Sequence, residues 1–249
     1  EEAIVPVRGA FLGHVPWQPG MDATALQSSP LQVESVRMVR TAILQRLGPG
    51  SHIVQVSSPE PSSGKSTLSL MLGRSLAQCG KRVLLVDADV LRPSLGRVLG
   101  IRNSPGLMDV LADQPPPHDG VRETSIPRLS VLTSGEWSDQ VELERLANGA
   151  LSAFLERCRA NFDIVLLDSS PLLGTANGAI LSRQVDGTLL AVRERHCKRA
   201  ALLAALAALS AAGGRLLGTV FVGSSGLSAY GYDHSYHYRR AETQAEESK

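Results

Sequence analysis

A glycine, a lysine and several hydroxyl side chains stand together at positions 61–67, where the sequence reads PSSGKST. A loop of this kind turns backbone N–H groups toward nucleotide phosphates, and a helix that begins there adds its partial positive charge. Lys65 would neutralise phosphate charge, and the Ser66 hydroxyl would bind Mg²⁺. We therefore expect ATP and Mg²⁺ to bind at Ser62, Ser63, Gly64, Lys65, Ser66 and Thr67.

Carboxylates follow two apolar segments. Asp87 and Asp89 come after the segment 83–86, at a spacing that places both side chains on one face of a strand, and Asp168 comes after 164–167. Carboxylates at the carboxyl ends of parallel strands belong to the ligand crevice of a doubly wound sheet. Asp89 and Asp168 are therefore predicted magnesium ligands. The alternative is that these acids only cap the turns after their strands.

Elements that could position these residues follow from the hydrophobic pattern. An apolar stripe predicts a helix from Leu31 to Leu47, ended by Gly48. Later runs are apolar on both faces, and helical patterns separate most of them, which favours an α/β fold with a doubly wound, mostly parallel sheet. The predicted strands are Ile53–Ser57, Val83–Val86, Leu129–Leu132, Ile164–Leu167, Thr188–Val192 and Leu216–Val222.

Composition narrows the class of protein. The 249 residues suit one α/β domain with extensions, and a net charge of +1 gives no global electrostatic case for nucleic acid binding. Three cysteines without CxxC spacing argue against a disulfide framework or a zinc site and favour a reducing cytoplasm. The apolar run Ala200–Gly214 is shorter than the roughly 20 residues that span a bilayer, so we expect a buried helix there.

Three regions are expected along the chain. Four prolines within residues 1–30, with no sustained helix or strand period, predict an extended arm, and residues 31–222 form the predicted nucleotide-binding domain. Residues 223–249 are a predicted flexible tail. All four tyrosines of the protein lie in that tail within nine positions, as Tyr230, Tyr232, Tyr236 and Tyr238. The alternative for this cluster is an adhesive aromatic patch.

The phosphate loop and the two Asp-bearing strands resemble the deviant-Walker group of P-loop ATPases. Members that partition DNA or place division septa carry an extra lysine early in the loop, where this chain has Glu60. From about Phe11 to Tyr238 the chain instead resembles the bacterial tyrosine kinases that accompany polysaccharide co-polymerases. The shared motifs are an ExxRxxR helix at Glu34, Arg37 and Arg40, Walker A at 57–67, Walker A′ at 86–93, Walker B at 163–171, Val185-Asp186-Gly187 and the C-terminal tyrosines.

This resemblance implies an ATP-dependent autokinase whose tail tyrosines are phosphorylated between subunits of a ring. Glu34, Arg37 and Arg40 would then form the subunit contacts. A tyrosine hydroxyl must lose its proton as it attacks, so Asp87 is the expected base. The arm would join a membrane-spanning polysaccharide co-polymerase or activator, fused upstream or separate. The chain would then be a cytoplasmic domain at the inner face of a bacterial membrane, excised from a longer protein because it begins without methionine.

Several positions depart from the family's pattern. Pro59 replaces the first Walker A glycine, and the arginine of Walker A′ stands one place late, as Arg92. Ser169 and Ser170 stand where threonine and proline are usual, and Asn177 where aspartate is common. Two alternatives therefore stay open. One is a catalytically silent ATP-binding partner of a polysaccharide export complex, and the other is an ATPase switch that phosphorylates nothing.

Overall fold

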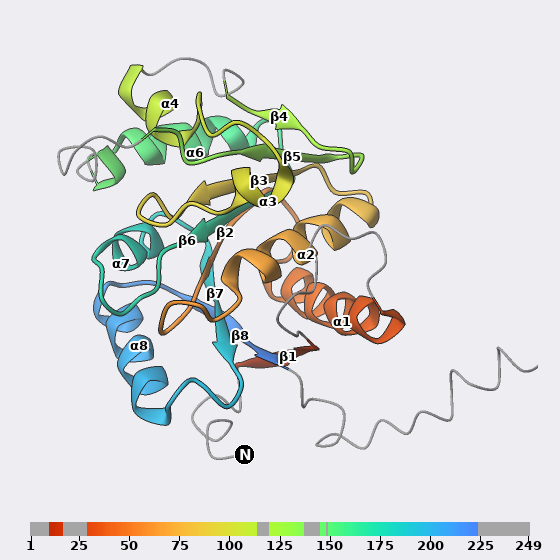
Figure 1. Ribbon diagram of the computed structural model, residues 1–249, viewed down its shortest axis with the longest axis vertical. Helices are drawn as coiled ribbons and strands as arrows, with labels where there is room; N and C mark the ends of the chain where they lie inside the picture. The colour runs from red at the N-terminus through yellow and green to blue at the C-terminus, as the bar shows by residue number, and fades with distance from the viewer. Residues whose placement is uncertain (1–9, 17–28, 114–119, 137–144, 148, 224–249) are drawn as a thin grey trace, which may run out of the picture.

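The computed structural model describes residues 10–16, 29–113, 120–136, 145–147 and 149–223 (Figure 1). Eight strands form one sheet in the order β1-β8-β7-β2-β6-β3-β5-β4, and all neighbouring strands are parallel except β4 and β5. The strands are β1 Phe11–Pro16, β2 His52–Ser57, β3 Val83–Ala88, β4 Arg122–Glu123, β5 Leu129–Leu132, β6 Ile164–Ser169, β7 Gly187–Arg193 and β8 Leu216–Gly223.

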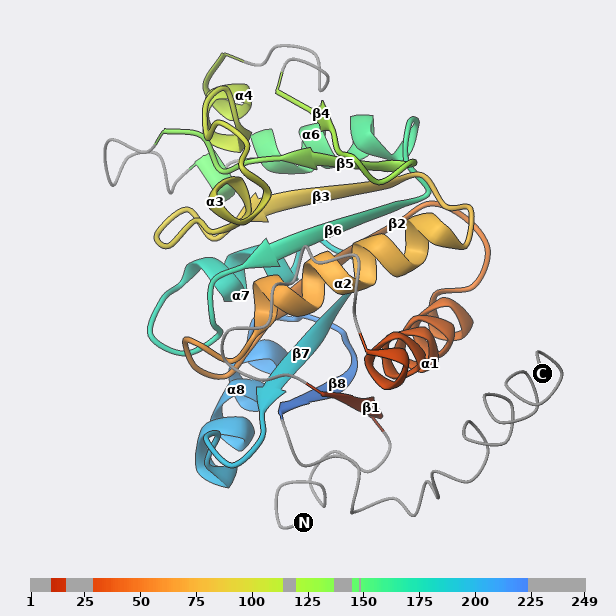
Figure 2. The same ribbon diagram turned by 45° about the vertical axis from the view of Figure 1, so that its right-hand side comes forward.

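Helices cover both faces of the sheet. Figure 2 shows α1 and α2 in front of it, and the residues that α4, α6, α7 and α8 bury belong to separate clusters on the other face. The helices are α1 Pro30–Leu47, α2 Lys65–Gln78, α3 Leu95–Leu99, α4 Leu107–Asp113, α6 Ala150–Arg159, α7 Asn177–Ser182 and α8 Arg199–Ala211.

The central strands are apolar on both faces because each face packs against helices. In β3, Leu85 joins the cluster on the α1 and α2 side, whereas Leu84 joins the cluster on the α4 and α6 side. All six residues of β3 and of β6 are buried. A strand covered in this way accepts charged side chains only near its end, where a ligand or another polar group can meet them.

The sheet confirms the predicted doubly wound α/β class and the six predicted strands, and α1 ends before Gly48 as expected. One difference concerns the arm, which was expected to hold no strand. Residues Phe11–Pro16 form β1 at the edge of the sheet, parallel to β8. The sequence of this short segment does not alternate between apolar and polar residues, so no local pattern predicts a strand there. The segment is a strand because it pairs with β8. The tail lies outside the described residues.

The helix predicted at Ala200–Gly214 is present as α8, but the expectation that it is buried was wrong. Only one stripe, Leu202, Ala205 and Leu209, packs on the sheet, while Leu203 is 44% exposed. Alanines occupy most of the outer face, so composition alone did not separate the two faces. In the described ranges, no helix is both long and apolar enough to cross a bilayer.

The segment Val185-Asp186-Gly187 fastens the amino end of β2 to α6 and β7. Asp186 accepts hydrogen bonds from the Ile53 N–H at 2.7 Å and from the Arg159 guanidinium at 2.9 and 3.0 Å. Burial alone would raise the pKa of Asp186, but these hydrogen bonds hold it below the usual range. The next position is a glycine because β8 lies close to it. A Cβ on Gly187 would stand 2.4 Å from Leu217 Cγ.

The close approach at Gly187 gives a stability prediction. Gly187→Ala should lower the free energy of unfolding by about 1–3 kcal/mol because the added methyl group overpacks the β7–β8 contact. Urea unfolding of Gly187→Ala, Leu217→Ala and the double variant measures this effect. The double variant should lose less stability than the sum of the single losses, since shortening Leu217 makes room for the methyl group. Additive losses, or an unchanged midpoint for Gly187→Ala, would contradict the assigned contact.

Candidate active site

The phosphate loop joins β2 to α2 through a glycine that no other residue replaces easily. Gly64 has a φ of +84°, a conformation that L side chains rarely adopt, and α2 begins at the next residue, Lys65. A Cβ on Gly64 would also stand 3.0 Å from Val222 Cγ1, near the end of β8. The loop is therefore held between the start of α2 and the carboxyl end of β8.

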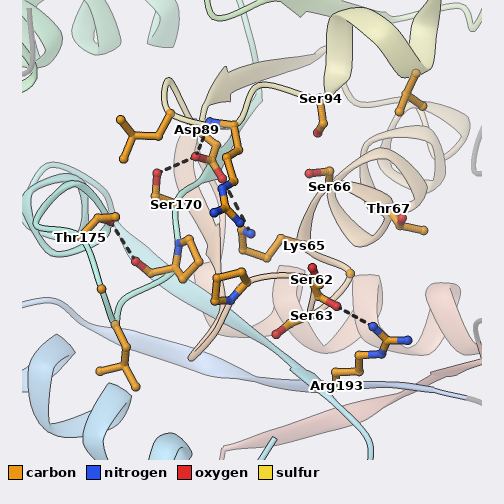
Figure 3. A pocket seen from close by; sticks show the side chains of 18 of the residues that line it. Ser62, Ser63, Lys65, Ser66, Thr67, Asp89, Ser94, Ser170, Thr175 and Arg193 are labelled. Atoms are coloured by element: carbon orange, nitrogen blue, oxygen red, sulfur yellow. Dashed lines mark hydrogen bonds and ion pairs between the residues drawn. The ribbon is translucent and has the colours of Figure 1, made fainter. Parts of the chain in front are cut away.

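Hydroxyl groups and one arginine stabilise the irregular first half of this loop. The Ser58 and Ser63 hydroxyls each donate to the Glu60 carbonyl at 2.7 Å. Ser62 has a φ of +59°, and its carbonyl accepts a hydrogen bond from Arg193 Nη1 at 3.0 Å (Figure 3). Side-chain hydrogen bonds thus hold the backbone at positions where the usual motif relies on glycine.

Asp89 meets Lys65 at the floor of the site. Its Oδ2 lies 3.8 Å from Lys65 Nζ, and both side chains are only 9% exposed. Its Oδ1 accepts a hydrogen bond of 2.7 Å from the Ser170 hydroxyl and one of 3.3 Å from the Arg92 N–H. Figure 3 shows Lys65, Asp89 and Ser170 facing one another across the ends of α2, β3 and β6.

Asp87 and Asp168 lie side by side below Asp89, as register partners on β3 and β6, and both are fully buried. Burial raises the pKa of Asp87 to about 6, against hydrogen bonds from the Leu95 and Ser94 N–H groups. Burial and the nearby charge of Asp87 raise the pKa of Asp168 to about 7, against the Ser66 hydroxyl and the charge of Lys65. The two acids are thus poised to change protonation near neutral pH.

A cavity of about 740 Å³ opens above these groups. Its walls come from the phosphate loop and the start of α2, the loops after β3 and β6, α3 and the last residue of β7. They include Ser62, Ser63, Gly64, Lys65, Ser66, Thr67, Asp89, Arg92, Ser170 and Arg193. Asp87 and Asp168 do not line it. Of the other predicted site residues, Glu34, Arg37 and Arg40 lie on α1, and the four tyrosines lie outside the described residues.

Sequence reasoning missed two residues of this site, Arg193 and Ser170. Arg193 is the last residue of β7, and its position at the carboxyl end of a strand beside β2 was the signal that could have marked it. Ser170 was noticed only as a departure from the usual proline. Its hydrogen bond to Asp89 joins residues 81 positions apart, which no local pattern shows.

The donor set fits a magnesium ion that arrives with a nucleotide. Among the described residues, no three His, Cys, Asp or Glu side chains are arranged to hold a metal by themselves. Mg²⁺ is usually held by one or two carboxylates together with substrate phosphates and water. One buried oxygen of each acid, Asp87 Oδ1 and Asp168 Oδ2, has no hydrogen-bond partner in the described part of the chain. The Ser66 hydroxyl lies close enough to Asp168 to lower its pKa, and a cation bound beside Ser66 would offset the charge of that carboxylate.

Comparison with known proteins places this site in a family. Residues 51–199 match a family model described as an AAA domain. The chain is 34% identical over 167 residues to the tyrosine-protein kinase ptk of Acinetobacter johnsonii, covering 67% of this chain and 23% of the relative. It is 31% identical over 205 residues to the tyrosine-protein kinase YwqD of Bacillus subtilis, covering 81% and 86%.

Solved structures support the same family. The BceF tyrosine kinase domain superposes with a TM-score of 0.75 at 32% identity, over 86% of this chain and 93% of that structure. The septum site-determining protein MinD of Pyrococcus horikoshii, solved with Mg-ADP, superposes with a TM-score of 0.58 at 22% identity, over 69% of this chain and 70% of that one, and shows the shared deviant-Walker fold alone. The chain spans about a quarter of the length of the first curated relatives. It belongs to the bacterial tyrosine-protein kinase family, as the P-loop domain of that family.

Proposed function

We propose that this chain is the catalytic domain of an ATP-dependent protein-tyrosine kinase that phosphorylates its own tail. The observation that carries the proposal is the meeting of Lys65 and Asp89 at the floor of a phosphate-loop cavity, directly above Asp87 and Asp168. Membership of the tyrosine-kinase family and the four clustered tail tyrosines support the choice of acceptor.

Nucleotide binding is assigned to the phosphate loop. The backbone N–H groups at the start of α2 and the Lys65 ammonium would hold the β- and γ-phosphates. Ser66, Asp89 and Asp168 would hold Mg²⁺, which supplies charge neutralisation for the transferred phosphoryl group. Arg193 keeps the loop in place through the Ser62 carbonyl and lines the same cavity.

Asp87 is the proposed base. The tyrosine oxygen forms a bond to the γ-phosphorus, the bond from that phosphorus to the bridging oxygen breaks, and ADP leaves. The phenolic proton passes to Asp87 Oδ1, which has no hydrogen-bond partner among the described residues, while Oδ2 stays fixed by the N–H groups of Ser94 and Leu95. Because Asp87 does not line the ligand-free cavity, this role requires the loop after β3 to move when the acceptor binds.

The acceptor tyrosines are proposed to react in trans within a ring-like homo-oligomer. Glu34 and Arg37 form an exposed ion pair on α1 at 3.4 Å and are available for subunit contacts, whereas Arg40 bonds to Ser75 of α2 in its own chain. Distance alone does not select reaction in trans, because β8 ends beside the phosphate loop and Tyr230 follows Gly223 by seven positions. The proposal therefore rests on the ExxRxxR helix.

The cellular role proposed for this kinase is control of exopolysaccharide or capsule polymerisation and export. A membrane-spanning co-polymerase, fused upstream or separate, would hold the domain at the inner face of the bacterial membrane. Each phosphate adds a charge of about −1.5 to −2, so several phosphates on four neighbouring tyrosines would repel one another and weaken the ring. The motifs shared with the polysaccharide-associated kinases support this role.

Phosphotyrosine formation tests the proposed chemistry. Incubation with ATP and Mg²⁺ should label the wild-type tail, and Lys65→Met should lower labelling by about 10²-fold or more because the phosphate loses its main neutralising group. A variant with all four tyrosines changed to phenylalanine should take no label, and Lys198→Met, at an exposed lysine before α8, serves as the control. Mass spectrometry locates the phosphate.

Mixing the kinase-inactive Lys65→Met variant with the kinase that lacks the four tail tyrosines separates transfer in cis from transfer in trans. Label on the Lys65→Met chain in the presence of the tyrosine-free chain is expected for transfer in trans, and no label there would contradict that route. Release of inorganic phosphate by the wild type without any phosphotyrosine would instead favour the ATPase switch. Failure to bind ATP and Mg²⁺ would favour a silent partner.

The raised pKa values of Asp87 and Asp168 give a pH prediction. A base acts only when it is ionised, so kcat/KM should fall as the pH drops through the range from about 7 to about 6, where these pKa values lie. Asp87→Asn should lower kcat by about 10²–10⁴-fold and leave the affinity for ADP nearly unchanged. A pH profile that stays flat from 5 to 8 would contradict the role of Asp87.

Subunit contacts at α1 can be tested with the dephosphorylated protein. Arg37→Ala should shift the mass in light scattering from an assembly toward a monomer, because the Arg37 side chain is 55% exposed and, within the described ranges, pairs with Glu34 of its own helix. Arg40→Ala is less informative because it also removes the bonds to Ser75. Thr41→Ala, on the same exposed face, is the matched control. An unchanged mass for Arg37→Ala would exclude this contact.

A further inference from the structure

Ser170 is the first residue after β6, and its hydroxyl is the closest polar neighbour that the structure gives to Asp89. The hydroxyl donates to Asp89 Oδ1 at 2.7 Å, and Ser170 is 1% exposed. The other oxygen of Asp89, Oδ2, faces Lys65 at 3.8 Å. One carboxylate thus stands between a serine on one side and the phosphate-loop lysine on the other.

Ser170 is itself held rigidly. Its carbonyl accepts hydrogen bonds from the Ser57 hydroxyl at 2.8 Å and from the Ser169 hydroxyl at 3.3 Å. Ser169 in turn accepts a bond of 2.9 Å from Gln55, whose own oxygen accepts one of 2.8 Å from Thr188. The network runs through buried side chains of β2, β6 and β7, so the donor stands in one place before any ligand binds.

The Asp89 carboxylate and the Lys65 ammonium are further apart than the two groups of a close ion pair. A close ion pair between an ammonium and a carboxylate has an N···O distance of about 2.7–2.9 Å. At 3.8 Å the pair is looser, and the Ser170 hydroxyl holds the other oxygen of the same carboxylate, Oδ1. A lysine in a loose pair leaves it easily to meet a phosphate.

We infer that Ser170 is a positioning residue that fixes Asp89 and so keeps Lys65 available for the nucleotide phosphates. The inference rests on the proposed function of the phosphate loop. The proline that is usual at this position in the family has no side-chain donor and could not make the bond. Without the hydroxyl, Asp89 would turn toward Lys65, and the nucleotide would have to break a closer pair.

Calorimetric titration with ADP and Mg²⁺ tests this role without requiring phosphoryl transfer. Ser170→Ala should weaken binding by roughly three- to tenfold, the effect expected from the net loss of one typical hydrogen bond, and Ser170→Thr should restore it because threonine keeps the hydroxyl. Ser152→Ala is the matched control, because Ser152 also donates a bond of 2.7 Å, to Gln184 on the surface, and neither residue lines the cavity. Thermal unfolding of each variant checks the fold.

A double-mutant cycle separates positioning from packing. In the background of Asp89→Asn, where Lys65 has no carboxylate to pair with, Ser170→Ala should have no further effect on the affinity for ADP. Equal losses in both backgrounds, or wild-type affinity in Ser170→Ala, would overturn the inference while leaving the proposed function intact. A wild-type protein that binds no ADP would overturn both.

Discussion

The fold brings one ammonium group and three carboxylates together at the carboxyl ends of two neighbouring strands. Lys65 lies against Asp89, and Asp87 and Asp168 lie directly beneath. Three acids lie near this one ammonium group in a buried place, and burial, together with the charges of the neighbouring acids, raises the pKa values of Asp87 and Asp168. A divalent cation that arrives with phosphates satisfies this arrangement, because it offsets the acids while Lys65 turns to the phosphates.

The sheet and the phosphate loop hold this cluster of charged groups in place. The central strands are apolar along their length, so they can be buried on both faces and carry acids only near their ends. At the amino end of β2, Asp186 accepts hydrogen bonds from the Ile53 N–H and from Arg159, and so fixes the start of the strand that leads into the phosphate loop. The phosphate loop has no glycine at the first Walker A position, and hydrogen bonds from Ser63 and Arg193 help to hold its backbone in place.

Much of this could be predicted from the sequence, because apolar runs mark buried strands and the spacing of Lys65, Asp87, Asp89 and Asp168 follows the ends of those runs. What pattern could not show depends on contacts between distant segments. β1 forms because its backbone pairs with β8. The exposed face of α8 is rich in alanine, so its sequence does not differ from that of a buried face. The contacts of Ser170 and Arg193 likewise join loops far apart in the chain. The predicted roles of the site residues, and of the tail tyrosines outside the described residues, remain proposals.

Proton release on nucleotide binding tests the central claim, that a buried acid cluster waits for a cation with phosphates. Calorimetry of ADP and Mg²⁺ binding, repeated in buffers of different ionisation enthalpy, counts the protons. Because binding should lower the raised pKa values of Asp87 and Asp168, roughly half to one proton should be released near pH 6.5 and almost none near pH 8.5. Binding without proton release at pH 6.5 would contradict the account.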